Sequence, residues 1–229
     1  MLIYKKFIFF IIILLFIIIG SFNYFKYNDV ITYFATDISN SGYLVNLIDE
    51  KGFGKNPSLN FNNSSCKVLN FYDISNNCNN FITKFYNNDF LDKIKNIINE
   101  EKLFFIDPII DPLAFVIQLY KENDFMSYHF DTNFSLGKRY TVIIPLYLNE
   151  FNTSYLTIKD KSKNEKKIII PIGKAIVYNG DNVLHKVSKQ EIGGERISLI
   201  INLTTNSNYS LLGKYLQKVR NYMFINYTW

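Results

Sequence analysis

Cysteine, histidine and arginine are scarce in this chain of 229 residues, and their scarcity narrows the possible functions. Two cysteines and two histidines are present, with no Cys-x-x-Cys pair and no zinc-ligand spacing, which excludes a zinc-finger module. Only three arginines occur, and the lysines are scattered among acidic residues without forming a basic stripe interleaved with aromatics. The formal charge of +5 therefore gives no support to nucleic-acid binding.

Apolar residues, in contrast, are plentiful. Hydrophobic residues make up 48% of the chain and aromatic residues 17%, which is ample for a packed core. This composition excludes disorder of the whole chain. The length leaves room for one medium-sized domain with appendages, and hardly for two full domains.

The N-terminus contains a long apolar run behind two lysines. Lys5 and Lys6 precede an uninterrupted apolar run at residues 7–19, and the longer stretch 7–25 contains only three weak interruptions. A membrane-spanning helix needs about 20 such residues, and a signal peptide has the same layout. Because the exit from the run is a poor cleavage site, we favour an uncleaved signal anchor, that is, a single-pass transmembrane helix. The two lysines should stay cytoplasmic, which places the rest of the chain on the lumenal or external side.

The two cysteines fit that location without deciding it. Cys66 and Cys78 are separated by eleven residues in an Asn- and Ser-rich stretch. A disulfide could close this loop in an oxidising compartment, and two free thiols are the alternative. The sequence leaves both open.

The remaining pattern predicts an all-β core with flanking helices. Residues 81–102 carry apolar side chains near helical spacing, interrupted around Asn87 and Asn88, and predict one or two amphipathic helices. From residue 103 onward the pattern changes to short runs rich in β-branched and aromatic residues. Their spacing indicates a sandwich or jelly roll. The seven predicted strands are 103–106, 114–120, 140–148, 155–158, 167–170, 175–178 and 197–203.

These observations divide the chain into four parts. We predict a cytoplasmic tip and signal anchor over 1–26, a stem with flanking helices over 27–102, a β-domain over 103–205 and a C-terminal helix over 206–229. The stem is predicted as irregular before residue 81. The last helix is indicated by apolar residues that return to helical spacing after Thr205.

Both histidines fall in positions that suggest a metal site. His129 and Asp131 stand two residues apart in a segment that precedes a predicted strand, so in extended backbone their side chains share one face. His185 follows the predicted strand 175–178 and a Gly-Asp turn. Two imidazoles and one carboxylate on one face of a metal are typical of non-haem iron(II) sites, which keep the opposite positions open. Each signal alone is weak, because a single histidine in a strand is more often structural than a ligand.

A cation downstream strengthens the interpretation. Arg196 stands eleven residues after His185 at the start of a predicted strand, and a planar guanidinium can bind a carboxylate through two parallel hydrogen bonds. Ser198 lies two residues on, hence on the same face, and could donate a further hydrogen bond. The simpler interpretation of Arg196 is a surface salt bridge with Glu195 or Glu191.

Together these residues resemble a known family. The stretch 116–203 is similar to the 2-oxoglutarate/iron(II)-dependent oxygenases, most closely to the prolyl and lysyl hydroxylase branch. The resemblance covers somewhat under half of the chain. It is carried by Tyr120, His129-Phe130-Asp131, Arg139-Tyr140-Thr141 leading to Tyr147-Leu148-Asn149, Gly173-Lys174-Ala175, His185-Lys186-Val187 and Gly194-Glu195-Arg196-Ile197-Ser198.

The resemblance implies both a fold and an activity. The fold would be a double-stranded β-helix, or jelly roll, with Fe(II) held in its mouth by His129, Asp131 and His185. Tyr120, Thr141 and Arg196 would hold the distal carboxylate of the co-substrate 2-oxoglutarate, with ascorbate as a further candidate cofactor. The activity would be O₂-dependent hydroxylation of a substrate that the sequence does not identify, with a polypeptide side chain as the candidate by analogy.

Two departures from the family pattern bear on the substrate. The Gly-Gly that often follows the Tyr-Leu-Asn strand is absent, and Thr153-Ser154-Tyr155-Leu156 stands there instead. The cation is Arg196, where prolyl 4-hydroxylases usually have lysine. The alternative function is a jelly-roll binding or structural membrane protein that has the fold without turnover.

Overall fold

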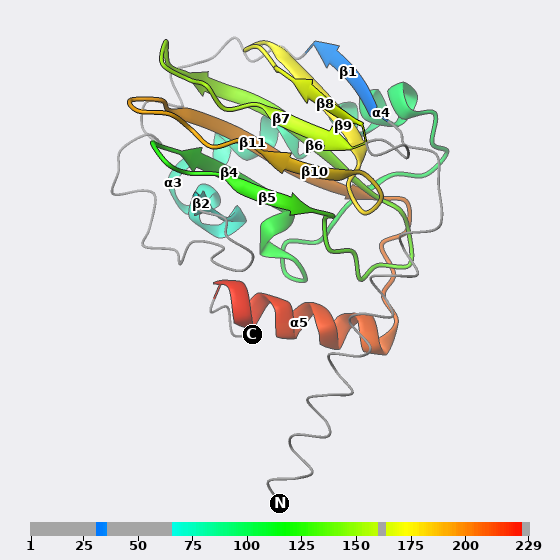
Figure 1. Ribbon diagram of the computed structural model, residues 1–229. Helices are drawn as coiled ribbons and strands as arrows, with labels where there is room; N and C mark the ends of the chain where they lie inside the picture. Colours follow the sequence, from blue (N-terminus) through cyan, green and yellow to red (C-terminus); the bar gives the residue numbers. More distant parts are fainter. Residues whose placement is uncertain (1–30, 36–65, 160–163, 226–229) are drawn as a thin grey trace, which may run out of the picture.

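The computed structural model describes residues 31–35, 66–159 and 164–225, and within them the chain forms two facing antiparallel sheets flanked by helices (Figure 1). The larger sheet has the strand order β1-β9-β6-β11-β4-β2, with β3 also paired to β11, and the smaller sheet has the order β5-β10-β7-β8. The strands are β1 Ile31–Ala35, β2 Lys67–Leu69, β3 Phe104–Phe105, β4 Phe115–Tyr120, β5 Met126–His129, β6 Arg139–Leu148, β7 Leu156–Lys159, β8 Glu165–Ile168, β9 Lys174–Asn179, β10 Leu184–Val187 and β11 Arg196–Thr204.

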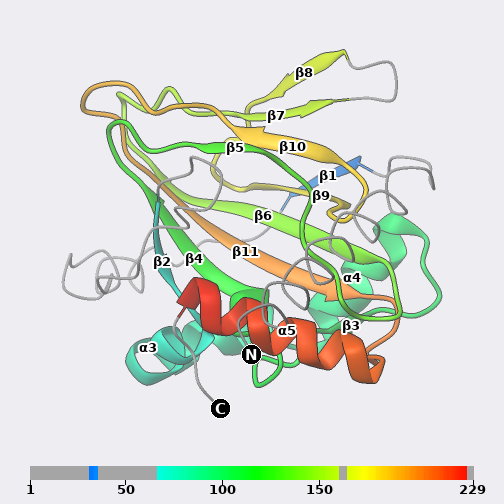
Figure 2. The same cartoon turned by 60° about the horizontal axis from the view of Figure 1, so that its bottom comes forward.

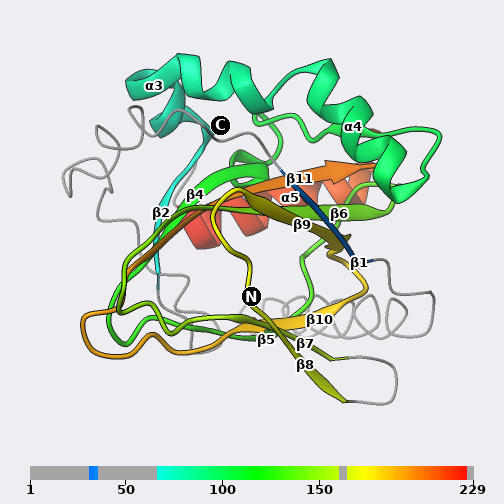
Figure 3. The ribbon, with the colours of Figure 1, turned by 90° about the horizontal axis from the view of Figure 1, so that it is seen from above.

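Helices α3 (Phe71–Phe85) and α4 (Asn88–Ile98) cover one face of the larger sheet, and the smaller sheet faces the other (Figure 3). Strand β6 is buried on both faces because it lies between these layers. Tyr140, Val142 and Ile144 belong to the core under the helices, whereas Ile143 belongs to the core between the sheets. By the same alternation Thr141 faces the smaller sheet. The interior between the sheets is therefore partly polar.

The jelly-roll prediction is confirmed, and each of the seven predicted strands has its counterpart within a few residues. The break predicted near Asn87 is also confirmed, because the Asn87 side chain accepts a hydrogen bond from the Phe90 backbone and starts α4 there. The predicted C-terminal helix is α5, Leu211–Ile225, and a short 3₁₀ turn, η1, spans Pro112–Ala114.

Other predictions differ from the structure. Strands β1 and β2, and the first part of α3, lie in the stretch predicted as an irregular stem. Helix α3 begins about ten residues before the predicted start, because Asn70 and Asp73 form a capping box that satisfies the first free backbone N–H groups. Strands β5 and β10 were not predicted, since four-residue strands carrying polar side chains give little periodic signal.

Cys66 is a buried free thiol, so of the two alternatives for the cysteines the structure has no disulfide at this residue. Burial raises the pKa of Cys66 to about 12. The predicted anchor at residues 7–25 lies outside the described residues. None of the helices in the described part of the chain has the length and apolarity that a membrane span requires.

Candidate metal centre

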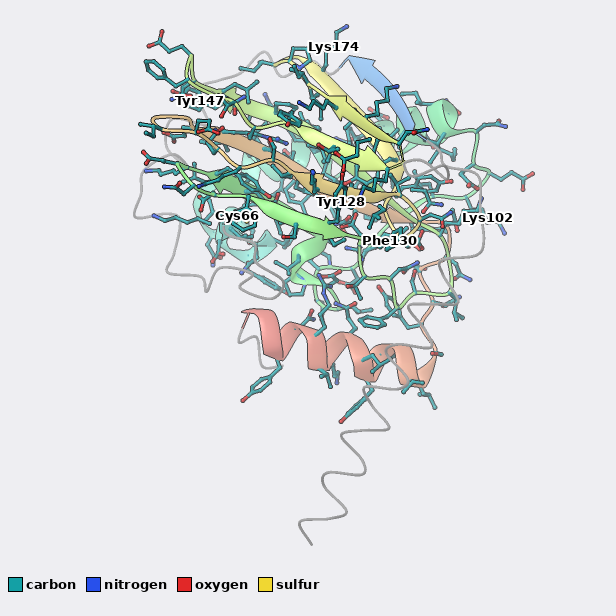
Figure 4. The ribbon with its side chains drawn as sticks, viewed as in Figure 1. Cys66, Lys102, Tyr128, Phe130, Tyr147 and Lys174 are labelled. Atoms are coloured by element: carbon teal, nitrogen blue, oxygen red, sulfur yellow. The ribbon has the colours of Figure 1, made fainter. Side chains whose placement is uncertain are left out.

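The two histidines meet across a pair of neighbouring strands. His129 ends β5, and His185 lies in β10 directly opposite it in the antiparallel register. In Figure 4 the labelled Tyr128 and Phe130 lie near the end of β5. Asp131 follows after one residue, and its backbone N–H donates to the Gly180 carbonyl at 2.8 Å, which holds the segment against the turn after β9.

The three predicted ligands converge. The Asp131 Oδ1 atom lies 3.7 Å from the Nε2 atom of His129 and 3.7 Å from that of His185. The two imidazole rings are 4.2 Å apart between centroids. The possible ligand atoms all lie within 4.8 Å of one another. Since two atoms 3.7 Å apart can both contact an ion at about 2.1 Å, this spacing suits a single metal ion.

Hydrogen bonds to the backbone orient both imidazoles. The Nδ1 atom of His129 lies 2.8 Å from the Ser127 carbonyl oxygen, and that of His185 lies 2.8 Å from the Val183 carbonyl oxygen. Because a carbonyl can only accept, each Nδ1 must carry the proton, which leaves the Nε2 lone pair free. Such second contacts are typical of metal-binding histidines.

The protonation states also suit a metal. Burial, helped by His129 and opposed by Asp131, lowers the pKa of His185 to about 4, so this imidazole is neutral at physiological pH. Burial of Asp131 opposes its ionisation, yet His185, His129, Arg139 and the Thr141 hydroxyl together hold its pKa below the ordinary value. A neutral imidazole and an ionised carboxylate are the forms that bind metal ions.

The second oxygen of Asp131 is fixed by its surroundings. The Thr141 hydroxyl donates a short hydrogen bond to Asp131 Oδ2. Gly180 packs so closely that a Cβ atom at this position would overlap this same oxygen and Thr141 Oγ1. The turn after β9 therefore requires glycine at this position, because any larger residue would push Asp131 away.

Three of the four predicted co-substrate residues lie together near the start of β11, namely Arg196, Ser198 and Tyr120. Arg196 is 4% exposed, and its Nε atom donates to Ser198 Oγ at 2.9 Å. Tyr120 is opposite Arg196 in the register of β4 and β11, with the guanidinium carbon 5.8 Å from the ring centroid. Among the described residues no carboxylate forms an ion pair with Arg196, which is too buried for a surface salt bridge. A buried guanidinium group that has no anionic partner favours the binding of a carboxylate ligand.

Thr141 does not join this group. It lies opposite Asn202 in the register of β6 and β11, six residues along the strand from Arg196, and its hydroxyl contacts Asp131. The direction of β6 carries Thr141 to the histidine end of the sheets, beside a metal ligand. The role that the resemblance implies for Thr141, binding the distal carboxylate beside Arg196, stays a prediction.

Tyr178 is a site residue that the sequence reasoning did not single out. It is buried on β9 opposite Thr141, and its ring lies edge-on against His185 with 4.9 Å between centroids. Burial first, and then Asp131 and Tyr120, raise its pKa, while Arg196 opposes the rise. Tyr178 therefore lies beside the histidine pair. Its place at the end of a predicted strand, just before the Gly180 turn, was the available signal.

Several solved structures have a similar architecture. A prolyl-4-hydroxylase from Pseudomonas putida aligns with a TM-score of 0.55 at 13% identity, covering 78% of this chain and 93% of that one. The epimerase SnoN from nogalamycin biosynthesis aligns with a TM-score of 0.62 at 10% identity, covering 83% and 82%, and SnoN has also been solved with Fe³⁺ and alpha ketoglutarate. The chain has the 2OG-Fe(II) oxygenase fold.

A third similar structure with this oxygenase fold is a prolyl hydroxylase from Trichoplax adhaerens, in complex with a hypoxia inducible factor peptide fragment. It aligns with a TM-score of 0.52 at 14% identity, covering 81% of this chain and 86% of that one. No family model and no curated protein matches the sequence. At these identities the likeness establishes the oxygenase fold, and the chemistry depends on the residues described above.

Proposed function

We propose that this protein is a 2-oxoglutarate- and Fe(II)-dependent oxygenase that hydroxylates a polypeptide side chain, as prolyl and lysyl hydroxylases do. The observation that carries the proposal is the convergence of His129, Asp131 and His185, with both Nδ1 protons donated to carbonyls, inside an oxygenase fold. Two imidazoles and one carboxylate from one side leave the remaining metal positions open.

Each group of residues has a separate task in this proposal. His129, Asp131 and His185 would hold Fe(II). Arg196, oriented by Ser198, would bind the distal carboxylate of 2-oxoglutarate through two parallel hydrogen bonds, and Tyr120 would pack beside it. When bound, iron and 2-oxoglutarate supply the oxidation, in which O₂ places one oxygen atom in the substrate C–H bond and the other in succinate as CO₂ leaves.

The experiment is an assay of succinate release. Full-length protein, Fe(II), ascorbate and 2-oxoglutarate are incubated with peptides that contain proline or lysine, and with matched peptides that lack both. We expect succinate and a peptide mass increase of one oxygen atom, both abolished by chelation of the metal. Metal binding without succinate release under any of these conditions would instead favour a binding or structural protein.

We also propose that residues 7–25 anchor the protein in a membrane, with the oxygenase domain on the lumenal or external side. Support comes from the apolar run itself and from Lys5 and Lys6 before it. We expect the protein to remain in the membrane fraction after alkaline carbonate washing, with its N-terminal peptide intact by mass spectrometry. A soluble chain that begins near Ser21 would identify the segment as a cleaved signal peptide.

A further inference from the structure

Helix α5 is tied to the segment that precedes β4 by polar contacts. The Asn221 side chain donates to the Ile110 carbonyl at 2.7 Å, and Gln217 donates to Asn221 at 2.8 Å. The preceding residue of the helix, Arg220, donates from Nη1 to Asp111 Oδ2 at 3.0 Å. Figure 2 shows α5 lying across this end of the molecule. The helix therefore docks through specific hydrogen bonds.

Asp111 is fully buried, with 0% of its surface exposed, and it forms ion pairs with two arginines. Its Oδ2 atom accepts hydrogen bonds from Arg220 of α5 and from Nη1 and Nη2 of Arg139, at 3.2 and 3.3 Å. The burial of Asp111 raises its pKa, but the two guanidinium groups outweigh that effect and hold the pKa below the ordinary value. This cluster joins α5 to the first residue of β6.

Arg139 also contacts Asn202, which lies closer to the metal ligands. Its Nε atom donates to Asn202 Oδ1 at 3.3 Å, and the Asn202 amide group donates to the Leu113 carbonyl at 3.2 Å, which fixes the orientation of this side chain. Asn202 Oδ1 lies 2.9 Å from Thr141 Oγ1. The Thr141 hydroxyl has one proton and two acceptors within reach, Asn202 Oδ1 and Asp131 Oδ2.

Arg139 weakens one of these two acceptors, because it donates to Asn202 Oδ1. Because Asn202 Oδ1 already accepts from Arg139, its second lone pair is a weaker acceptor than the ionised Asp131 carboxylate, and the Thr141 proton goes to Asp131. Without the Arg139 contact, Asn202 Oδ1 would compete more strongly for the Thr141 proton, and the hydrogen bond to the second oxygen of Asp131 would weaken. The orientation of a metal ligand therefore depends on a cation that is itself held by Asp111.

We propose that this relay, defined as Arg220, Asp111, Arg139, Asn202 and Thr141, positions the Asp131 carboxylate, so that docking of α5 sets the affinity of the metal site. The proposal rests on the proposed function in one respect, that Asp131 is a metal ligand. The members of the relay are positioning residues, since only Thr141 touches a ligand. Buried ion pairs are often no more stabilising than apolar residues of the same size, so a positional role accounts for charges that stability alone does not require.

The test is Mn(II) binding to the full-length protein, measured as loss of the free Mn(II) signal in electron paramagnetic resonance. Contacts behind a metal ligand typically contribute about 10- to 100-fold in affinity. Thr141→Val should therefore raise the Mn(II) dissociation constant by roughly tenfold, whereas Thr141→Ser, which keeps the hydroxyl, should stay within about twofold of the wild type. Arg220→Met should raise it by about three- to tenfold, because the effect is relayed. Lys214→Ala, an exposed position on the same helix, is the matched control and should leave it unchanged.

A double variant tests the route. If α5 acts through Thr141, the combined Thr141→Val and Arg220→Met protein should bind Mn(II) as weakly as Thr141→Val alone, while independent effects would multiply. Thermal unfolding of the metal-free proteins is recorded in parallel. An Arg220→Met protein that unfolds more easily but binds Mn(II) like the wild type would reduce the Arg220 contact to a structural one, and a Thr141→Val protein with unchanged affinity would overturn the relay.

Mn(II) binding by the wild type and by His185→Asn tests the metal site separately from the relay. Mn(II) binding that is lost in His185→Asn supports the metal site, and unaltered binding by the relay variants would then overturn the relay alone. A wild type that binds no Mn(II) would overturn both.

Discussion

Replacement of His185 by asparagine should abolish 2-oxoglutarate turnover and leave the fold intact. Asparagine is of similar size and polarity but is a poor ligand for iron, so two ligands remain where the site needs three. The fold should survive because His185 lies in the smaller sheet, between β5 and β7, whereas the main apolar core lies under α3 and α4. His129→Ala and Asp131→Ala should be equally inactive, and combining them should cost nothing further.

Two measurements check this result. Succinate release reports turnover, and thermal melting reports binding, because Mn(II) with 2-oxoglutarate should stabilise the wild type by linkage and should not stabilise the variants. Lys189→Ala is the control, an exposed position four residues from His185. If His185→Asn decarboxylated 2-oxoglutarate at the wild-type rate, the ligand assignment would be wrong, and a non-catalytic binding protein would become the better interpretation.

Arg196→Ala should raise the apparent constant for 2-oxoglutarate by roughly 30-fold or more and leave Mn(II) affinity nearly unchanged. Loss of a charge-assisted pair of hydrogen bonds costs on the order of 2–4 kcal/mol. No described carboxylate pairs with Arg196, so its removal orphans no buried anion. The metal ligands lie outside β11, on β5, on β10 and in the segment after β5, which is why the two affinities should separate.

The matched variant is Arg196→Lys, which keeps the charge but loses the planar fork. It should fall between the wild type and Arg196→Ala, because an ammonium group binds a carboxylate without the bidentate geometry. Titration of 2-oxoglutarate at saturating Fe(II) gives the three constants. Equal constants in all three proteins would assign Arg196 to packing against Tyr120 and remove it from the co-substrate site.

Local pattern explains what could be predicted about the fold. Strands β6 and β11 are long and apolar, and their runs of β-branched and aromatic residues are visible without knowledge of any neighbour. Strands β5 and β10 are four residues each, and they form by pairing with one another, with His129 opposite His185. A local sequence pattern does not reveal such pairing. The start of α3 had a local signal, the Asn70 and Asp73 capping box, that hydrophobic periodicity does not capture.

The sequence by itself determined the two-residue spacing of His129 and Asp131, which extended backbone turns into a shared face, and the jelly-roll class that follows from short β-rich runs. The tertiary structure alone decided what surrounds those ligands. Thr141 lies 10 residues from Asp131 in sequence, and Arg220 lies 109 residues from Asp111, yet each pair is in hydrogen-bond contact. Side-chain alternation acts over neighbouring residues and leaves its record in the sequence, whereas such contacts arise only when strand register and helix docking bring distant residues together.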